Sequence, residues 1–286
     1  MPKKLRALDL LLQQGLVENE KDATARILAG EVYAGTRRVQ SKAEMIDKDT
    51  VLRVKGAGNP YFSKGGLKLQ GAIHDFGITV RDRVCIDAGA STGGFTDCLV
   101  RHGAALVYAV DVGYGQLMGA LRQDPHVVNL EKTNISDEKL LTLSPRPTLG
   151  SVDLSYLSLR LGIPAFAEVL HHDGELMCLV KPLFETEDTA ARRSGVLSDD
   201  AYLPILRDLI RDINQMPSAA VQNVTYSPVT GNTGTREFFL HVVLSTAPQT
   251  APDLDRAAAE AVEKVLRGSV PDGKTQTLVL RAALLK

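Results

Sequence analysis

The feature that most constrains the fold is a regular alternation of short apolar segments with helix-length segments, which runs from about residue 83 to residue 245. Apolar residues recur at helical spacing over 93–102, 116–122, 158–170 and 200–214. The segments with strand character are "RVCIDAGA", "ALVYAVDVG", "VVNLE", "GSVDLS", "GELMCLVKP", "AVQNVTYSP" and "EFFLHVVLS". This rhythm predicts an α/β protein with a doubly wound, Rossmann-like sheet that helices cover on both faces. The last two strands have no helix between them, so we expect them to form an antiparallel pair at one edge.

A smaller α+β unit precedes this sheet. Residues 5–12 and 20–28 show helical spacing, whereas "EVYAG" and "DTVLRVKG" alternate like strands. The stretch "GAGNPYFSKGG", at 56–66, is rich in glycine and marks a junction. The sequence therefore predicts a first domain over 1–58, a linker over 59–66, a second domain over 67–268 and an unassigned C-terminal extension over 269–286.

The charge is distributed unevenly along the 286 residues. Residues 1–70 hold 13 Lys and Arg against 8 Asp and Glu, a net +5, which leaves −6 for the rest of a chain whose net charge is −1. A basic N-terminal region favours docking to a polyanion.

The cysteines and the apolar runs help to predict the cellular compartment of the protein. Cys85, Cys98 and Cys178 lack metal-ligand spacing and lie in apolar patterns, which predicts buried, reduced thiols and no metal site. The start, "MPKKLRALDLLLQQG", is broken by Asp9, and no apolar run reaches the roughly 18 residues of a spanning helix. We expect a cytoplasmic protein without membrane contact, and the sequence indicates no protein partner.

The loop "VCIDAGASTGGFTD", at 84–97, has three possible interpretations. It fits the G-x-S-x-G pattern of a hydrolase with Ser91 as nucleophile, but His241 lies inside a predicted strand and is poorly placed for a triad. It lacks the G-x-G-x-x-G spacing of a dinucleotide site. A methyl-donor site is the third interpretation: Asp111 would accept the ribose hydroxyls of S-adenosylmethionine, and Asp87 would lie near its cationic methionine portion. Glycine-rich turns after strands are common, so the loop alone leaves the choice open.

Charged residues at other strand ends favour the third interpretation. Asp153 and Lys181 end successive predicted strands and should reach the same sheet edge as the loop. Lys68, just before the first strand of the second domain, and Glu237, which opens the last, are further candidates. A lysine beside an aspartate suits proton removal from a weakly acidic hydroxyl, because desolvation can lower a lysine's pKa until the neutral amine serves as base.

These residues closely resemble a known family. The segments "SKGGLKL", "DAGASTGGFTDCL", "AVDVGYGQL", "LEKTN", "DLSYLSL", "LVKPLFE" and "REFFLHV" occur in the order found in the TlyA family, often labelled hemolysin A, whose catalytic domain resembles the FtsJ-type RNA methyltransferases. The resemblance covers residues 1 to about 268. It implies methyl transfer from S-adenosylmethionine to a ribose 2'-hydroxyl of ribosomal RNA.

The resemblance also implies roles for individual residues. Lys181 would activate the 2'-hydroxyl, Asp153 would orient Lys181, and Lys68 with Glu237 would position the ribose. The donor pocket would comprise Asp87, Gly89, Ser91, Gly93, Gly94 and Asp111, with Glu131 or Asn134 near the adenine. The N-terminal domain resembles the alpha-L RNA-binding fold and would contact phosphates of ribosomal RNA or ribosomal subunits through Arg6, Lys21, Arg26, Arg37 and Arg38.

Two other functions compete with this one. The chain could be a catalytically inactive RNA-binding protein that acts in ribosome assembly, although all four positions of the family's catalytic tetrad are filled, by Lys68, Asp153, Lys181 and Glu237. It could also be a membrane-lytic hemolysin, which the lack of a spanning or lytic amphipathic segment disfavours.

Overall fold

The computed structural model describes residues 4–13, 17, 20–34, 37–48, 50, 52–54, 61–231 and 234–267. The chain divides into two compact units, Met1–Pro60 and Tyr61–Lys286, and each is considered by itself. The predicted C-terminal extension, 269–286, and part of the predicted linker lie outside the described residues.

The first unit is a small α+β fold, as predicted. Leu8, Leu11 and Ile27 from its two helices pack with Val32 and Leu52 from its strands. Strands β1, β3 and β4 were not predicted. Its elements are β1 (Lys4–Arg6), α1 (Ala7–Gln13), α2 (Glu20–Leu28), β2 (Val32–Ala34), β3 (Arg37–Arg38), β4 (Met45–Asp47) and β5 (Leu52–Val54).

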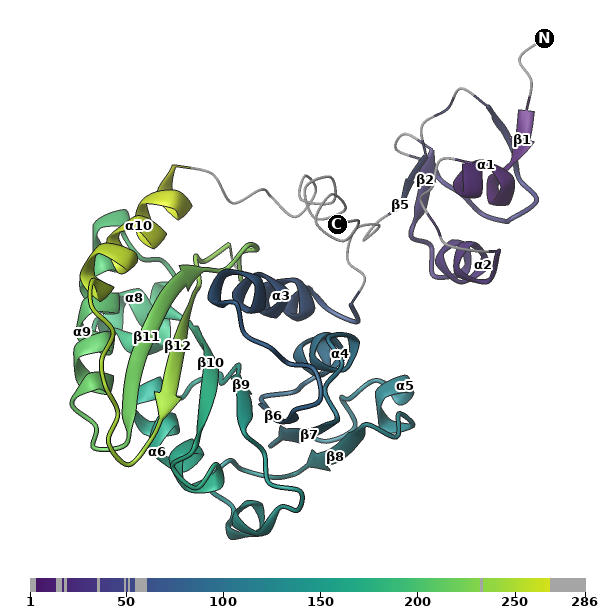
Figure 1. Ribbon diagram of the computed structural model, residues 1–286. Helices are drawn as coiled ribbons and strands as arrows, with labels where there is room; N and C mark the ends of the chain where they lie inside the picture. The colour runs from purple at the N-terminus through teal and green to yellow at the C-terminus, as the bar shows by residue number, and fades with distance from the viewer. Residues whose placement is uncertain are drawn as a thin grey trace. The chain divides into compact units, whose positions relative to one another are not determined.

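The second unit is built on a seven-stranded sheet with the order β11-β12-β10-β9-β6-β7-β8 (Figure 1). Strand β6 lies between β7 and β9, parallel to both, so the strand order reverses there and creates the usual ligand crevice of doubly wound sheets. Strand β12 runs antiparallel to both β10 and β11. The strands are β6 (Val84–Ala88), β7 (Leu106–Asp111), β8 (Val127–Glu131), β9 (Leu149–Val152), β10 (Gly174–Val180), β11 (Ala219–Tyr226) and β12 (Phe238–Leu244). The predicted doubly wound α/β class is confirmed, as is the antiparallel terminal pair.

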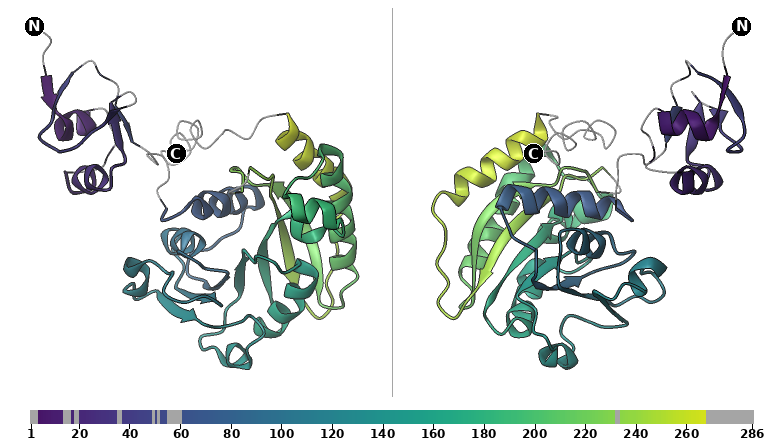
Figure 2. Two further views of the ribbon diagram at one scale, coloured as in Figure 1. Left: turned by 180° about the vertical axis from the view of Figure 1, so that it is seen from behind. Right: turned by 45° about the vertical axis from the view of Figure 1, so that its right-hand side comes forward.

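Helices cover both faces of this sheet (Figure 2). Because successive strand residues point to opposite faces, Cys85 packs on one side with helices α3 (Lys64–Phe76) and α4 (Gly94–Arg101), and Ile86 packs on the other. The second face is covered by α6 (Leu159–Val169), α9 (Tyr202–Asn214) and α10 (Leu254–Leu266). The three cysteines are buried free thiols, as predicted. Short helices α5 (Gly119–Arg122), α7 (Pro182–Glu185) and α8 (Thr189–Ser194) lie in connections.

Helix α3 corrects the predicted linker over 59–66, because the helix begins at Lys64. Ser63 caps it and accepts a hydrogen bond from Gly65 N at 3.2 Å. The neighbouring Gly66 lies against Tyr61, where an added Cβ would come within 2.1 Å of the ring. The two glycines therefore allow close packing in the first turn of a helix rather than flexibility. Helix α10 was not predicted either, although its apolar residues recur at helical spacing.

Candidate active site

The glycine loop between β6 and α4 brings the backbone close to the next strand end. Gly89 has φ +85°, a conformation that favours glycine, and an added Cβ would lie 2.2 Å from the carbonyl oxygen of Asp153. Ser91 also has positive φ, and its backbone N donates to Asp111 Oδ2 at 2.8 Å. The loop is therefore fixed between the ends of β7 and β9.

A cavity of 740 Å³ opens at this edge of the sheet, within the range of small-molecule sites. All four tetrad residues predicted from the sequence line it, from segments as far apart as residues 68 and 237. A second cavity of 280 Å³ shares Lys68, Gly89, Ser91 and Asp153 with it and extends toward the start of α3. The larger cavity is lined by Lys68, Ala88, Gly89, Ser91, Val110, Asp111, Val112, Gln116, Thr133, Asn134, Ile135, Asp153, Leu154, Ser155, Tyr156, Leu157, Lys181 and Glu237.

Lys68 and Glu237 form a nearly buried ion pair on the cavity wall. Lys68 projects from the second turn of α3 rather than from a segment before a strand, and its Nζ lies 2.5 Å from Glu237 Oε2. Glu237 reaches the carboxyl edge because β12 is antiparallel and therefore starts where its neighbour β10 ends. Burial raises the pKa of the Glu237 carboxyl, and the Lys68 ammonium opposes that rise.

Asp153 and Lys181 form a second pair, at the ends of the adjacent parallel strands β9 and β10. Lys181 Nζ lies 2.5 Å from Asp153 Oδ1, an ion pair that does not have hydrogen-bond geometry, and donates a hydrogen bond to Ser155 Oγ at 3.0 Å. The charges of Asp153 and Lys181 also act on the pKa of Glu237, so the two pairs are electrostatically coupled. Two ammonium groups and two carboxylates thus face one cavity beside the glycine loop.

Comparison with known proteins identifies the family of the chain. Residues 61–243 match the model of the FtsJ-like methyltransferases. The chain belongs to that family. The predicted enzyme class, a methyltransferase, is confirmed by this match.

The relatives of this FtsJ-like methyltransferase confirm the resemblance to the TlyA family. It is 34% identical to the 16S/23S rRNA (cytidine-2'-O)-methyltransferase TlyA of Mycobacterium tuberculosis, over 96% of this chain and 100% of that protein. It is 36% identical to Hemolysin A of Brachyspira hyodysenteriae, over 84% of this chain and all of that one. Among solved structures, "Putative hemolysin from Streptococcus thermophilus" is 33% identical, covers 94% of this chain and 99% of its own, and has a TM-score of 0.68.

Asp87 does not lie where the sequence suggested. In this methyltransferase its side chain is fully buried beneath the loop and does not line either cavity. It accepts hydrogen bonds from Thr96 Oγ1 at 2.6 Å and Ser151 Oγ at 2.8 Å, which join α4 to β9. Burial raises its pKa to about 7. Asp87 thus supports the loop from below, and its side chain does not line the cavity.

The other predicted donor-pocket residues divide into two groups. Gly89, Ser91 and Asp111 line the larger cavity and Gly94 the smaller one, whereas Gly93 faces the side chain of Leu121. Asn134 lines the larger cavity, but Glu131 does not, and its carboxylate accepts hydrogen bonds elsewhere.

Glu131 accepts the backbone N–H groups of Gln116 and Leu117 and has a pKa lowered to about 2, chiefly by the Leu117 contact. It therefore shapes the turn that carries Gln116, a cavity residue that was not predicted. Ser155 and Tyr156 were also missed, although they lie two and three positions after Asp153 in the quoted segment "DLSYLSL". Tyr156 lines the cavity with an exposed ring, whose centroid lies 5.2 Å from the centroid of the Phe184 ring.

The five residues of the first unit that were predicted to contact RNA differ in whether an acidic side chain already binds them. Arg6 is bound by Asp9 at 2.7 Å, Arg26 by Asp22 at 2.8 Å, and Arg37 by Glu44. Lys21 and Arg38 have exposed side chains. Within the described parts of the chain, no helix is long and apolar enough to cross a membrane, and no group of three or more His, Cys, Asp or Glu could hold a metal ion.

Proposed function

We propose that the protein transfers a methyl group from S-adenosylmethionine to a ribose 2'-hydroxyl of ribosomal RNA. One observation carries this proposal: the two Lys–carboxylate pairs, Lys68–Glu237 and Asp153–Lys181, face the same cavity as the glycine loop. An ammonium–carboxylate cluster beside a methyl-donor site suits an acceptor that must lose a proton.

The residues of the cavity fit the donor. Its 740 Å³ exceeds what a nucleoside with an amino-acid tail requires, and the absence of a side chain at Gly89 leaves the backbone open to a close approach. Both Asp111 oxygens already accept one backbone N–H each, from Ser91 and Gly113, and each keeps lone-pair capacity for a ribose hydroxyl. Asn134, Val112 and Ile135 supply an amide and apolar surface for a base.

The chemistry follows from the tetrad. When bound, S-adenosylmethionine supplies a methyl group that its sulfonium already activates, so the protein needs mainly to orient the acceptor oxygen and take its proton. In its neutral form, Lys181 accepts that proton at Nζ. The Asp153 carboxylate, 2.5 Å away, stabilises the ammonium that results. The Lys68–Glu237 pair presents fixed polar groups that can hold the ribose.

Several features support RNA as the acceptor. The TlyA relatives are named for cytidine-2'-O methylation of ribosomal RNA. The basic residues of the first unit suit phosphate contacts, and the exposed Tyr156 ring at the cavity offers a stacking surface to an unpaired base. An enzyme of this kind works where ribosomes are assembled, which agrees with the predicted cytoplasmic location.

The decisive experiment measures tritium transfer from labelled S-adenosylmethionine to purified ribosomal subunits, with nuclease digestion and mass spectrometry of the labelled nucleoside. Lys181→Ala is tested in parallel, and Lys139→Ala, a surface lysine that lines neither cavity, is the control. A ribose-methylated nucleoside that is lost only with Lys181→Ala supports the proposal.

Other outcomes would contradict different parts of it. A methylated base would rule out the ribose acceptor. Donor binding by calorimetry without transfer to either subunit would direct the search to another RNA. Failure to bind the donor would contradict the enzyme and leave the inactive RNA-binding protein.

A further inference from the structure

The distance between Asp153 and Lys181 is not set by the sheet alone. The ladder between the parallel strands β9 and β10 ends at the pair Val152 and Cys178. Both charged residues lie past that point, on the segments that leave the two strands. Asp153 N still donates to Ala88 O of β6 at 2.9 Å, and Val180, directly before Lys181, pairs with Phe238 of β12. The sheet thus holds each residue from its far side, but no sheet pairing joins the two to each other.

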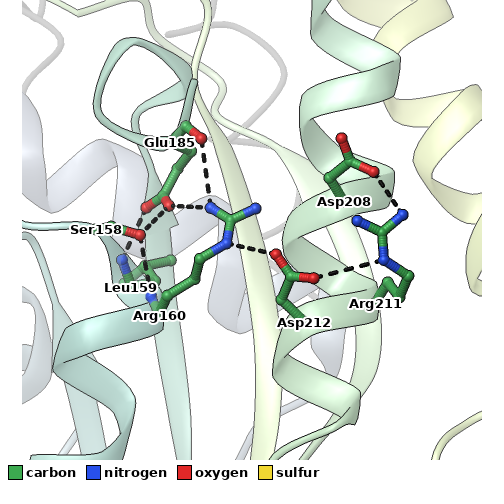
Figure 3. Close-up of polar contacts among 7 residues, drawn as sticks. All are labelled: Ser158, Leu159, Arg160, Glu185, Asp208, Arg211 and Asp212. Carbon is green, nitrogen blue, oxygen red and sulfur yellow. Dashed lines mark hydrogen bonds and ion pairs between the residues drawn. The ribbon is translucent and has the colours of Figure 1, made fainter. Parts of the chain in front are cut away.

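The side chain of Glu185 forms the joint between these two segments. It ends α7, the short helix that begins directly after Lys181. Its Oε1 accepts a hydrogen bond from Leu159 N at 2.8 Å, and its Oε2 accepts one from Ser158 Oγ at 2.5 Å (Figure 3). Leu159 is the first residue of α6, where the segment from Asp153 ends. One carboxylate thus connects the segment of Asp153 with the turn of Lys181.

Arg160 reinforces the joint from the solvent side. Its Nη1 donates to Glu185 Oε2 at 3.0 Å, and its Nε donates to Asp212 Oδ2 on α9 at 2.6 Å (Figure 3). The Glu185 side chain is only 2% exposed. A buried carboxylate with an amide, a hydroxyl and a guanidinium as donors has little freedom to move.

Helix capping accounts for only part of the contacts of Glu185: its Oε1 takes the N–H of Leu159, one of the N-terminal donors of α6, but its Oε2 also binds Ser158 Oγ and Arg160. Ser158 already caps α6, since its Oγ accepts the backbone N–H of Arg160 at 3.2 Å. In addition, Tyr156, between Asp153 and Ser158, has φ +67°, a conformation that is maintained only when the surrounding contacts hold the chain. The contacts of Glu185 fix the far end of that segment.

We infer that Glu185 is a positioning residue for methyl transfer: by fastening the start of α6 to α7, it holds Asp153 and Lys181 at ion-pair distance. This inference rests on the proposed function, in which Lys181 removes the acceptor proton. Glu185 touches neither reactant and acts through the placement of the other two side chains.

The test compares two isosteric variants of the full-length protein. Glu185→Gln keeps the shape of the side chain but places an amide or a neutral oxygen against Arg160. Asp212→Asn is the matched control, since it weakens the other contact of Arg160 and leaves the contacts of Glu185 to α6 in place. For each variant, kcat and KM are measured with ribosomal subunits as substrate. The concentration of donor sites is determined by calorimetry with S-adenosylmethionine, and kcat is calculated per donor site.

We expect Glu185→Gln to lower kcat roughly tenfold to hundredfold, the effect of a misplaced reactive group, with donor affinity and KM little changed. Asp212→Asn should keep kcat within about twofold, since it leaves the joint intact. If Glu185→Gln does not fold, Ser158→Ala, which removes the hydroxyl contact with Glu185 together with the N-cap bond to Arg160 N, should lower kcat severalfold in the same selective way.

Two results would overturn the inference. Equal kcat values per donor site for Glu185→Gln and Asp212→Asn, alongside an inactive Lys181→Ala, would show that Glu185 has only a structural role and would leave the proposed function standing. Full activity of Lys181→Ala would remove the base itself, so the proposed function and the inference would fail together.

Discussion

Lys68 Nζ lies 2.5 Å from Glu237 Oε2, although 169 positions separate the two residues in the sequence, and both side chains are almost inaccessible to solvent. A buried ion pair of this kind contributes little stability compared with apolar residues of the same size, but the loss of one partner is costly. The position of the pair at the cavity agrees with its proposed role of holding the ribose.

We expect Glu237→Leu to lower the free energy of unfolding by about 3–5 kcal/mol, because it leaves the Lys68 ammonium buried without its counter-charge. The double variant Lys68→Met/Glu237→Leu should regain most of this loss and still fail to transfer methyl groups. Urea denaturation and a transfer assay on the same samples provide the check. If the single variant were as stable as the parent protein, the pair would be solvated in solution.

Replacement of Gly89 by alanine tests the loop. Gly89→Ala adds a side chain at φ +85° and places Cβ 2.2 Å from the Asp153 carbonyl oxygen, so the backbone must shift. We expect a loss of about 2 kcal/mol or more in unfolding free energy, and at least roughly tenfold weaker binding of S-adenosylmethionine by calorimetry.

Gly77→Ala is the control for this substitution. Gly77 caps α3 at φ +65°, but an added Cβ there would meet no atom within 4 Å. It should cost about 1–2 kcal/mol of stability through backbone strain and leave donor binding unchanged. Similar donor affinities for the two alanine variants would argue against the loop as the binding site.

The pH dependence of stability should report on Asp87. Its pKa rises from an ordinary 3.8 to about 7 because the carboxyl is fully buried. Above pH 3.8 the unfolded chain releases this proton while the folded protein keeps it, so stability should fall as the pH rises from about 4 to 7 and then level off.

Asp87→Asn should flatten that segment of the curve and gain stability at pH 7, because a neutral amide replaces a carboxylate that is costly to bury. The measurement is the urea midpoint at several pH values between 4 and 8. An unchanged slope in the Asn variant would mean that another group causes the pH dependence.

RNA binding should depend on the exposed cations of the first unit. We expect Lys21→Ala/Arg38→Ala to weaken binding to ribosomal subunits and to reduce the slope of log affinity against log salt by roughly 1–2, since each lost phosphate contact releases fewer counterions. Arg6→Ala, whose guanidinium is already bound by Asp9, should change the slope less. Filter binding at several salt concentrations decides this, and equal slopes for all variants would place the RNA contacts elsewhere.

The sequence identified the edge of the sheet that carries the candidate site. Asp153 and Lys181 follow apolar segments, and parallel strands bring such ends together, so their proximity was predictable. The helix around Lys68 was not, because Gly65 and Gly66 resemble a flexible joint. Gly66 is needed for packing against Tyr61, and Gly65 lies close to Phe95, contacts that only the folded chain reveals.

The roles of acidic residues were harder to predict. Asp87 and Asp111 both lie at strand ends, yet one is buried under the loop and the other lines the cavity. The difference arises because Asp87 lies within reach of hydroxyls from Thr96 and Ser151, which come from other parts of the chain. The tie through Glu185 likewise depends on tertiary neighbours that no local pattern indicates.

The reversed direction of β12 has a consequence for the order of synthesis. This strand inserts between β10 and β11, and it delivers Glu237 to the site only after all the other strands of the sheet have been translated. A growing chain can present the glycine loop and Lys181 much earlier, but it lacks the carboxylate that faces Lys68. Because domains fold as units, an enzyme that modifies ribosomal RNA would thus remain inactive until β12 has been translated.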